Sequence, residues 1–152
     1  MQTVKVAAAA LNQTPLAWEQ NSANIRAAIS AAREVGVEIL CLPELCVSGY
    51  GCEDAFLSPA VQRTALEVVQ ELLPYTAGMV VTLGLPMLHT NRLFNTVALI
   101  ADREILGFSA KQTLSGDGVY YEPRWFKPWP RGLKGDVNID GKVFPIGDIF
   151  YD

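Results

Sequence analysis

Histidine and cysteine are scarce in this sequence, with one histidine and three cysteines among 152 residues. A single histidine, His89, argues against a Ser-His-Asp or Cys-His catalytic arrangement. The cysteines are odd in number and irregularly spaced, so they predict no disulfide framework. They are also too widely spaced to form a zinc site with the distant His89. We therefore expect a cytoplasmic protein without a bound metal.

Charged residues are also few, and no block of one sign occurs. They make up 18% of the chain, which has a net charge of −4 and is 50% hydrophobic. Such a composition favours a folded globular protein and argues against binding to nucleic acid or an anionic membrane. The longest apolar stretch, 78–88, is too short to span a bilayer. No glycine-rich phosphate loop is present, so we expect no cofactor and no ATP site in these residues.

The order of apolar segments predicts an α/β fold with a mainly parallel sheet. Helical periodicity runs from Trp18 to Val35, closed by Gly36, and again from 61 to 72. A hairpin is predicted around Asp140-Gly141, after a long loop over 114–136. Continuous apolar runs predict the other strands, of which the first three should be buried on both faces: 3–11, 37–42, 78–85, 93–101 and 105–109.

Two charged residues follow buried strands, where ligands bind in sheets of this kind. Glu44 comes after the strand at 37–42, and its apolar surroundings would suit it as a general base. It could equally be a strand-end residue that caps the next turn. Lys111 follows the strand at 105–109 and could stabilise a developing oxyanion. A solvated surface lysine is the alternative.

A third segment, 120–129, is rich in aromatic residues and contains Glu122 and Arg124. Its aromatic side chains could simply seal a loop to the core, and the two charged residues could form an ordinary surface pair. By itself this segment says nothing about a reaction.

Together the three segments resemble the carbon–nitrogen hydrolase, or nitrilase, superfamily over the whole chain. Members use a Glu–Lys–Cys triad on an α-β-β-α sandwich. The resemblance implies that Glu44 is the general base and that Lys111 steadies the tetrahedral intermediate. It also implies that Glu122 holds the lysine and the substrate in place.

The run at 49–54 is similar to one found in glutamine-dependent NAD synthetases, and the runs at 124–129 and 144–148 resemble the long, eukaryote-like branch of that family. This resemblance implies a glutaminase whose ammonia passes to a synthetase domain that uses ATP and magnesium to amidate deamido-NAD. It also implies a homo-oligomer. Tyr50 and Asp117 are candidates for contact with glutamine. The sequence departs from the family here, because Ser115 and Asp117 stand where many members have proline and tyrosine.

The family's nucleophilic cysteine should follow the hairpin by a few tens of residues, beyond Asp152. We therefore expect 1–152 to be the N-terminal portion of one glutaminase domain, the first half of the sandwich, inactive alone and without the synthetase domain. Cys41 lies in a predicted buried strand, where thiols are inert, Cys46 has no counterpart role in the family, and Cys52 lies in a loop. Two alternatives stay open: an amidase of the same superfamily acting on another amide, or a non-catalytic interaction module.

Overall fold

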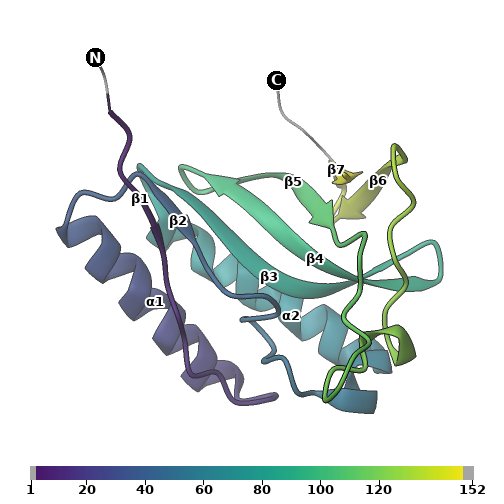
Figure 1. Cartoon of the computed structure of the whole chain (residues 1–152). Coiled ribbons are helices and arrows are strands. Elements are labelled where there is room, and N and C mark those ends of the chain that lie inside the picture. The colour runs from purple at the N-terminus through teal and green to yellow at the C-terminus, as the bar shows by residue number, and fades with distance from the viewer. Residues whose placement is uncertain (1–2, 149–152) are drawn as a thin grey trace.

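The computed structural model describes residues 3–148, and within them the strands form one mixed sheet in the order β1-β2-β3-β4-β5-β7-β6 (Figure 1). The pairs β1–β2, β2–β3 and β5–β7 are parallel, whereas β3–β4, β4–β5 and β6–β7 are antiparallel. The strands are β1 (Val6–Ala8), β2 (Ile39–Cys41), β3 (Val80–His89), β4 (Arg92–Ala101), β5 (Glu104–Ala110), β6 (Lys134–Ile139) and β7 (Lys142–Gly147).

The α/β class is confirmed, but the prediction of a mainly parallel sheet was wrong. Two tight turns reverse the chain on either side of β4. Their central residues, Thr90-Asn91 and Asp102-Arg103, all have positive φ angles. Such turns match the twist of antiparallel strands, and they replace the helical crossovers that a parallel sheet needs.

Both long helices, α1 (Trp18–Glu34) and α2 (Pro59–Leu72), lie on the same face of the sheet (Figure 1). α1 ends as predicted, because Gly36 adopts a φ of +74° immediately after the cap residue Val35. The helices bury Ile25, Ile29, Val69 and neighbouring residues against Val81, Leu83, Leu85, Ile100 and Phe108 of the sheet. We call this side the covered face.

Residues 3–148 also contain three short 3₁₀ helices: η1 (Glu53–Leu57), η2 (Leu73–Thr76) and η3 (Glu122–Arg124). η3 lies within the predicted loop at 114–136, whose last residues belong to β6. Across residues 3–148, none of the helices has the length and apolar character required to cross a membrane.

Within residues 3–148, neither long helix lies on the opposite side of the sheet, which we call the open face (Figure 1). Cross-strand pairing places two rows of residues on it, Val6–Ile39–Val80 and Cys41–Thr82–Leu99. The first strands, predicted to be buried on both faces of a complete sandwich, are covered on one face within residues 3–148, where β1 has three residues and Val6 is 65% exposed. Cys41, predicted to be buried and inert, is exposed on this side.

Candidate active site

The loop after β2 carries Glu44, and glycine at position 84 allows it to rest directly on β3. A Cβ atom added to Gly84 would lie 2.7 Å from the backbone oxygen of Pro43. The N–H of Val47 donates a hydrogen bond of 3.1 Å to the Gly84 carbonyl. Leu45 turns the chain with a φ of +51°. These contacts set the position of the Glu44 backbone relative to the sheet.

A second set of contacts, made by the segment around Gln13 and Asn21, holds the same loop. The buried Asn21 side chain donates to the carbonyl of Thr14 at 2.8 Å and accepts from its N–H at 3.0 Å. The Gln13 amide then donates to the Cys46 carbonyl at 2.7 Å. Buried polar groups paired in this way keep a loop in one conformation. The loop that carries Glu44 is therefore built rigidly.

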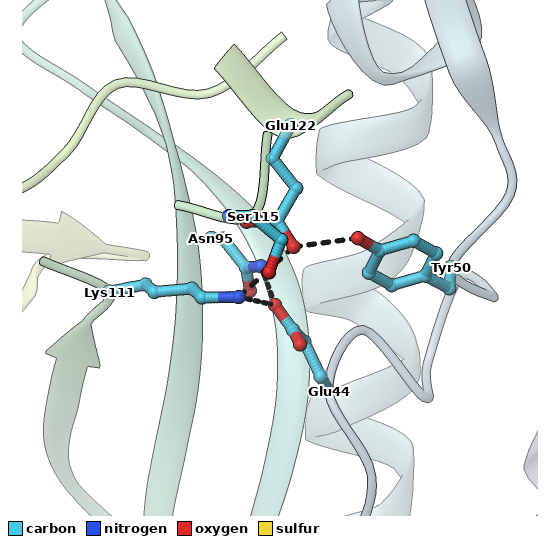
Figure 2. Close-up of polar contacts among 6 residues, drawn as sticks. All are labelled: Glu44, Tyr50, Asn95, Lys111, Ser115 and Glu122. Carbon is cyan, nitrogen blue, oxygen red and sulfur yellow. Dashed lines mark hydrogen bonds and ion pairs between the residues drawn. The ribbon is translucent and has the colours of Figure 1, made fainter. Parts of the chain in front are cut away.

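Lys111 extends from the end of β5 and reaches the two glutamates that the sequence singled out (Figure 2). Its ammonium lies 2.6 Å from Oε1 of Glu44 and 3.0 Å from Oε1 of Glu122. The structure thus brings Glu44, Lys111 and Glu122 together. Each comes from a different segment of the chain, and the lysine bridges the two carboxylates.

Glu122 is the most deeply buried member, with 2% of its side chain exposed. The hydroxyl of Tyr50 donates to its Oε1 at 2.7 Å, and the N–H of Ser115 donates to its Oε2 at 3.0 Å. Burial alone would raise the pKa of this carboxyl, but the hydrogen bonds from Tyr50, Ser115 and Lys111 lower it. Glu122 is therefore held as an anion.

The carboxylates of Glu44 and Glu122 also change the pKa values of Lys111 and Tyr50. Burial lowers the pKa of Lys111, but its hydrogen bonds to Glu44 and Glu122 outweigh this and raise the pKa above its usual value. Burial and the hydrogen bond to Glu122 raise the pKa of Tyr50. At neutral pH the lysine is charged and the tyrosine keeps its proton.

A cleft of about 320 Å³ adjoins this cluster and is bounded by Glu44, Lys111 and Asn95. Its lining includes Gly84, Val97 and Ser109, which form one cross-strand row on the open face. The ionic cluster therefore lies at the end of the open face, where a small ligand can approach it.

Residues 5–146 match the family model of carbon-nitrogen hydrolases. The chain belongs to this family. It is similar to a glutamine-dependent NAD(+) synthetase of Arabidopsis thaliana, with 38% identity over 131 residues, which are 85% of this chain and 18% of that protein. A Drosophila melanogaster protein of the same name is 36% identical over 90% of the chain. The chain thus spans about a fifth of the length of these curated relatives.

Solved structures agree with the family assignment. The chain superposes on a glutamine-dependent NAD(+) synthetase from Cytophaga hutchinsonii with a TM-score of 0.96 and 45% identity, covering 99% of this chain and 26% of that one. An amidase from Nesterenkonia sp. is similar with a TM-score of 0.73 at 20% identity, covering 93% of this chain and 54% of that one, and this shows the shared fold alone. The nitrilase-type fold expected from the sequence is confirmed.

Two of the three runs behind the narrower resemblance, 49–54 and 124–129, contact each other. Asp54 accepts hydrogen bonds from Nε and Nη2 of Arg124 at 2.7 and 2.9 Å, and one from the indole of Trp125 at 2.9 Å. Arg124 is therefore the ion-pair partner of Asp54, and not of its neighbour Glu122. The pair fastens η1 to η3, the element that carries Glu122.

The two residues predicted to contact a substrate differ in position. Tyr50 points into the cluster and its hydroxyl donates to Glu122 (Figure 2). Asp117 is exposed, and its side chain makes no hydrogen bond to Glu44, Lys111 or Glu122 in the part of the chain that the structure describes. Direct contact of either residue with a ligand stays a prediction.

None of the three thiols contacts Glu44 or Lys111 within residues 3–148. Burial raises the pKa of Cys46 to about 11, and its thiol faces the Gly84 carbonyl at 3.9 Å. Burial also raises the pKa of Cys52, which donates to the backbone of Ser48. Thiols of this kind are poor nucleophiles because they resist ionisation. The same residues contain no cluster of three metal-ligating side chains.

Asn95 is a member of the site that the sequence analysis missed. It is buried in the middle of β4, and its side chain donates a hydrogen bond to Glu44. The available signal was the polar pair Asn95-Thr96 inside an otherwise apolar strand. Such a pair needs buried hydrogen-bond partners, and here Thr96 finds the Leu85 carbonyl at 2.9 Å.

Proposed function

We propose that residues 1–152 form the N-terminal portion of the glutaminase domain of a glutamine-dependent NAD synthetase. The observation that carries this proposal is the Lys111 ammonium, held between two carboxylates beside a cleft on the open face. The relatives named glutamine-dependent NAD(+) synthetase support the choice of glutamine as the substrate.

The reaction would begin with a cysteine thiol supplied by a segment beyond Asp152. Glu44 takes the thiol proton, and the thiolate attacks the side-chain amide carbon of glutamine. An ammonium has three N–H donors, and Lys111 uses two of them on Glu44 and Glu122. The third is free to stabilise the oxyanion of the tetrahedral intermediate. Glu44 then returns its proton to the leaving nitrogen, which departs as ammonia while a thioester remains for water to hydrolyse.

Glu122 acts through Lys111 in this scheme. Its anionic form, favoured by three hydrogen bonds, keeps the ammonium charged and aimed at the cleft. We propose that the ammonia passes to a C-terminal synthetase domain, which would bind ATP and magnesium and amidate deamido-NAD. We also propose a homo-oligomer in the cytoplasm.

Ammonia release from glutamine by the longer protein tests this proposal. Glu44→Gln and Lys111→Met should each reduce the rate by about 100- to 1000-fold, the usual cost of losing one group that stabilises the transition state. Lys134→Met is the matched control, because Lys134 is an exposed lysine on β6. It should keep the normal rate.

Three outcomes would contradict the proposal. Full activity in Lys111→Met would remove the lysine from the mechanism. Turnover of other amides without any turnover of glutamine would favour the amidase alternative. Glutamine hydrolysis by residues 1–152 alone would show that a cysteine within them, such as Cys46, is competent.

A further inference from the structure

One buried residue, Asn95, contacts both reactive segments of the site, one through its side chain and the other through its backbone. Asn95 is 3% exposed and lies opposite Lys111. The backbone N–H of Lys111 donates to the backbone carbonyl of Asn95 at 2.9 Å. The side-chain nitrogen of Asn95 donates to Oε1 of Glu44. Strand β4 therefore aligns the backbone of the lysine and the carboxylate of the glutamate through a single residue.

The two oxygens of Glu44 have different surroundings (Figure 2). Both donors, the Lys111 ammonium and the Asn95 amide, bind Oε1. Oε2 receives no hydrogen bond from any residue between 3 and 148. The two donors occupy the lone pairs of Oε1, so Oε2 is the oxygen left open to accept a further hydrogen.

Lys111 alone would hold the carboxylate poorly. Its side chain is long and flexible, and the terminal torsion of a glutamate is broad. Asn95 is short, buried and fixed in the central part of the sheet. Its amide also keeps its donor at every pH, because it carries no titrating proton.

We propose that Asn95 is a positioning residue that fixes the Glu44 carboxylate so that Oε2 receives the proton. This inference rests on the proposed function. In the reaction, the S–H bond of the thiol breaks, an O–H bond forms at Oε2, and the electron pair stays on sulfur. The proton later leaves Oε2 for the nitrogen of the departing ammonia.

Two variants of the longer protein test the inference. Asn95→Leu removes the donor while keeping the approximate size of the side chain. It should reduce kcat for glutamine by about 10- to 100-fold, as expected for a small misplacement of a reacting group, with KM changed less than twofold. Asn95→Asp places a second carboxylate against Glu44, and the two then share a proton at neutral pH. Its activity should rise with pH to an optimum above that of the wild type.

Asn138→Asp is the control for this substitution, since Asn138 is exposed on β6 and far from Glu44 in the sheet order. Its rate and pH profile should match those of the wild type. The double variant Glu44→Gln with Asn95→Asp reverses donor and acceptor across the same contact. It should regain the melting temperature lost in Asn95→Asp but show no activity.

The failures of the two proposals are distinguishable. If Glu44→Gln reduces the rate as expected while Asn95→Leu keeps the wild-type kcat, the role of Asn95 is overturned and the glutaminase proposal stands. An unchanged pH profile in Asn95→Asp, or no recovery of stability in the double variant, also overturns it. Failure of the proposed function would instead appear as unchanged glutamine turnover in Glu44→Gln.

Discussion

The covered and open faces belong to the same strands but differ in what packs on them. On the covered face, Val81, Leu83 and Ile100 are fully buried beneath α1 and α2. On the open face, Val80, Val97 and Leu99 are only partly buried, and Val6 is mostly exposed. The strand residues are mainly apolar on both faces, so the two faces differ only in whether helices pack on them.

The apolar core that stabilises the fold and the residues of the candidate active site lie on different faces of the sheet. The covered face is a dense apolar core, and none of its residues belongs to the ionic cluster. Asn95 and Lys111 stand opposite one another at the end of the open face, next to Gly84, Val97 and Ser109. The site is therefore assembled on the side of the sheet that keeps room for a ligand and for a further layer of protein.

The largest expected effect comes from the covered face. Leu83→Ala removes a fully buried side chain from a close-packed region, so it should lower the free energy of unfolding by about 2–5 kcal/mol. Urea unfolding of the chain measures this. A loss below about 1 kcal/mol would show that the covered face is not the main source of stability.

A smaller loss of stability is expected at Gly84, an open-face position where the loop that carries Glu44 lies directly on β3. Gly84→Ala would force the backbone of Pro43 and its neighbours away from β3, at a cost of about 1–3 kcal/mol. Because that loop carries Glu44, ammonia release by the longer protein should fall as well. Gly141→Ala is a useful contrast, since no atom lies within 4 Å of its added Cβ and only its positive φ is strained. Normal activity in Gly84→Ala would mean that this contact does not position Glu44.

On the rest of the open face the effect on unfolding should be slight. Leu99→Lys should change the stability of the 152-residue chain by about 0.5 kcal/mol or less, because this side chain lies on an uncovered surface. The exposed apolar rows should make the chain self-associate, and the added charge should reduce light scattering. In the longer protein, the same change should lower the melting temperature if a further layer covers this face. A monodisperse wild-type chain that binds no apolar dye would contradict this prediction.

Local patterns in the sequence were sufficient for much of the fold. Helical spacing and Gly36 located α1, and the Asp140-Gly141 pair located the β6–β7 hairpin. The antiparallel pairing of β3 with β4 was missed because it depends on a two-residue turn at Thr90-Asn91, which contains no glycine. The short length of β1 was missed because the apolar run at 3–11 does not show which of its residues pair with β2.

The site was partly predictable for a related reason. Glu44 and Lys111 follow strands directly, so the sheet rule and the family motifs both identified them. Asn95 lies within a strand, where sequence position does not reveal which loop crosses above it. The ion pair between Asp54 and Arg124 joins segments 70 residues apart, and no local pattern shows such a contact.

The smallest effect is expected at this exposed pair. Hydrogen bonds from Arg124 and Trp125 lower the pKa of Asp54, so the folded protein binds its proton less readily than the unfolded chain does. The contribution of the pair to stability is therefore present above the ordinary carboxyl pKa of about 4, and it is lost progressively as the pH falls below that value. Asp54→Asn removes the contribution at every pH. The urea midpoints of wild type and variant should differ slightly near pH 7 and converge in acid. Asp136→Asn, a change at an exposed carboxylate on β6, controls for the altered net charge. A difference that grows on acidification would show that Arg124 holds η3 by a contact other than its ion pair with Asp54.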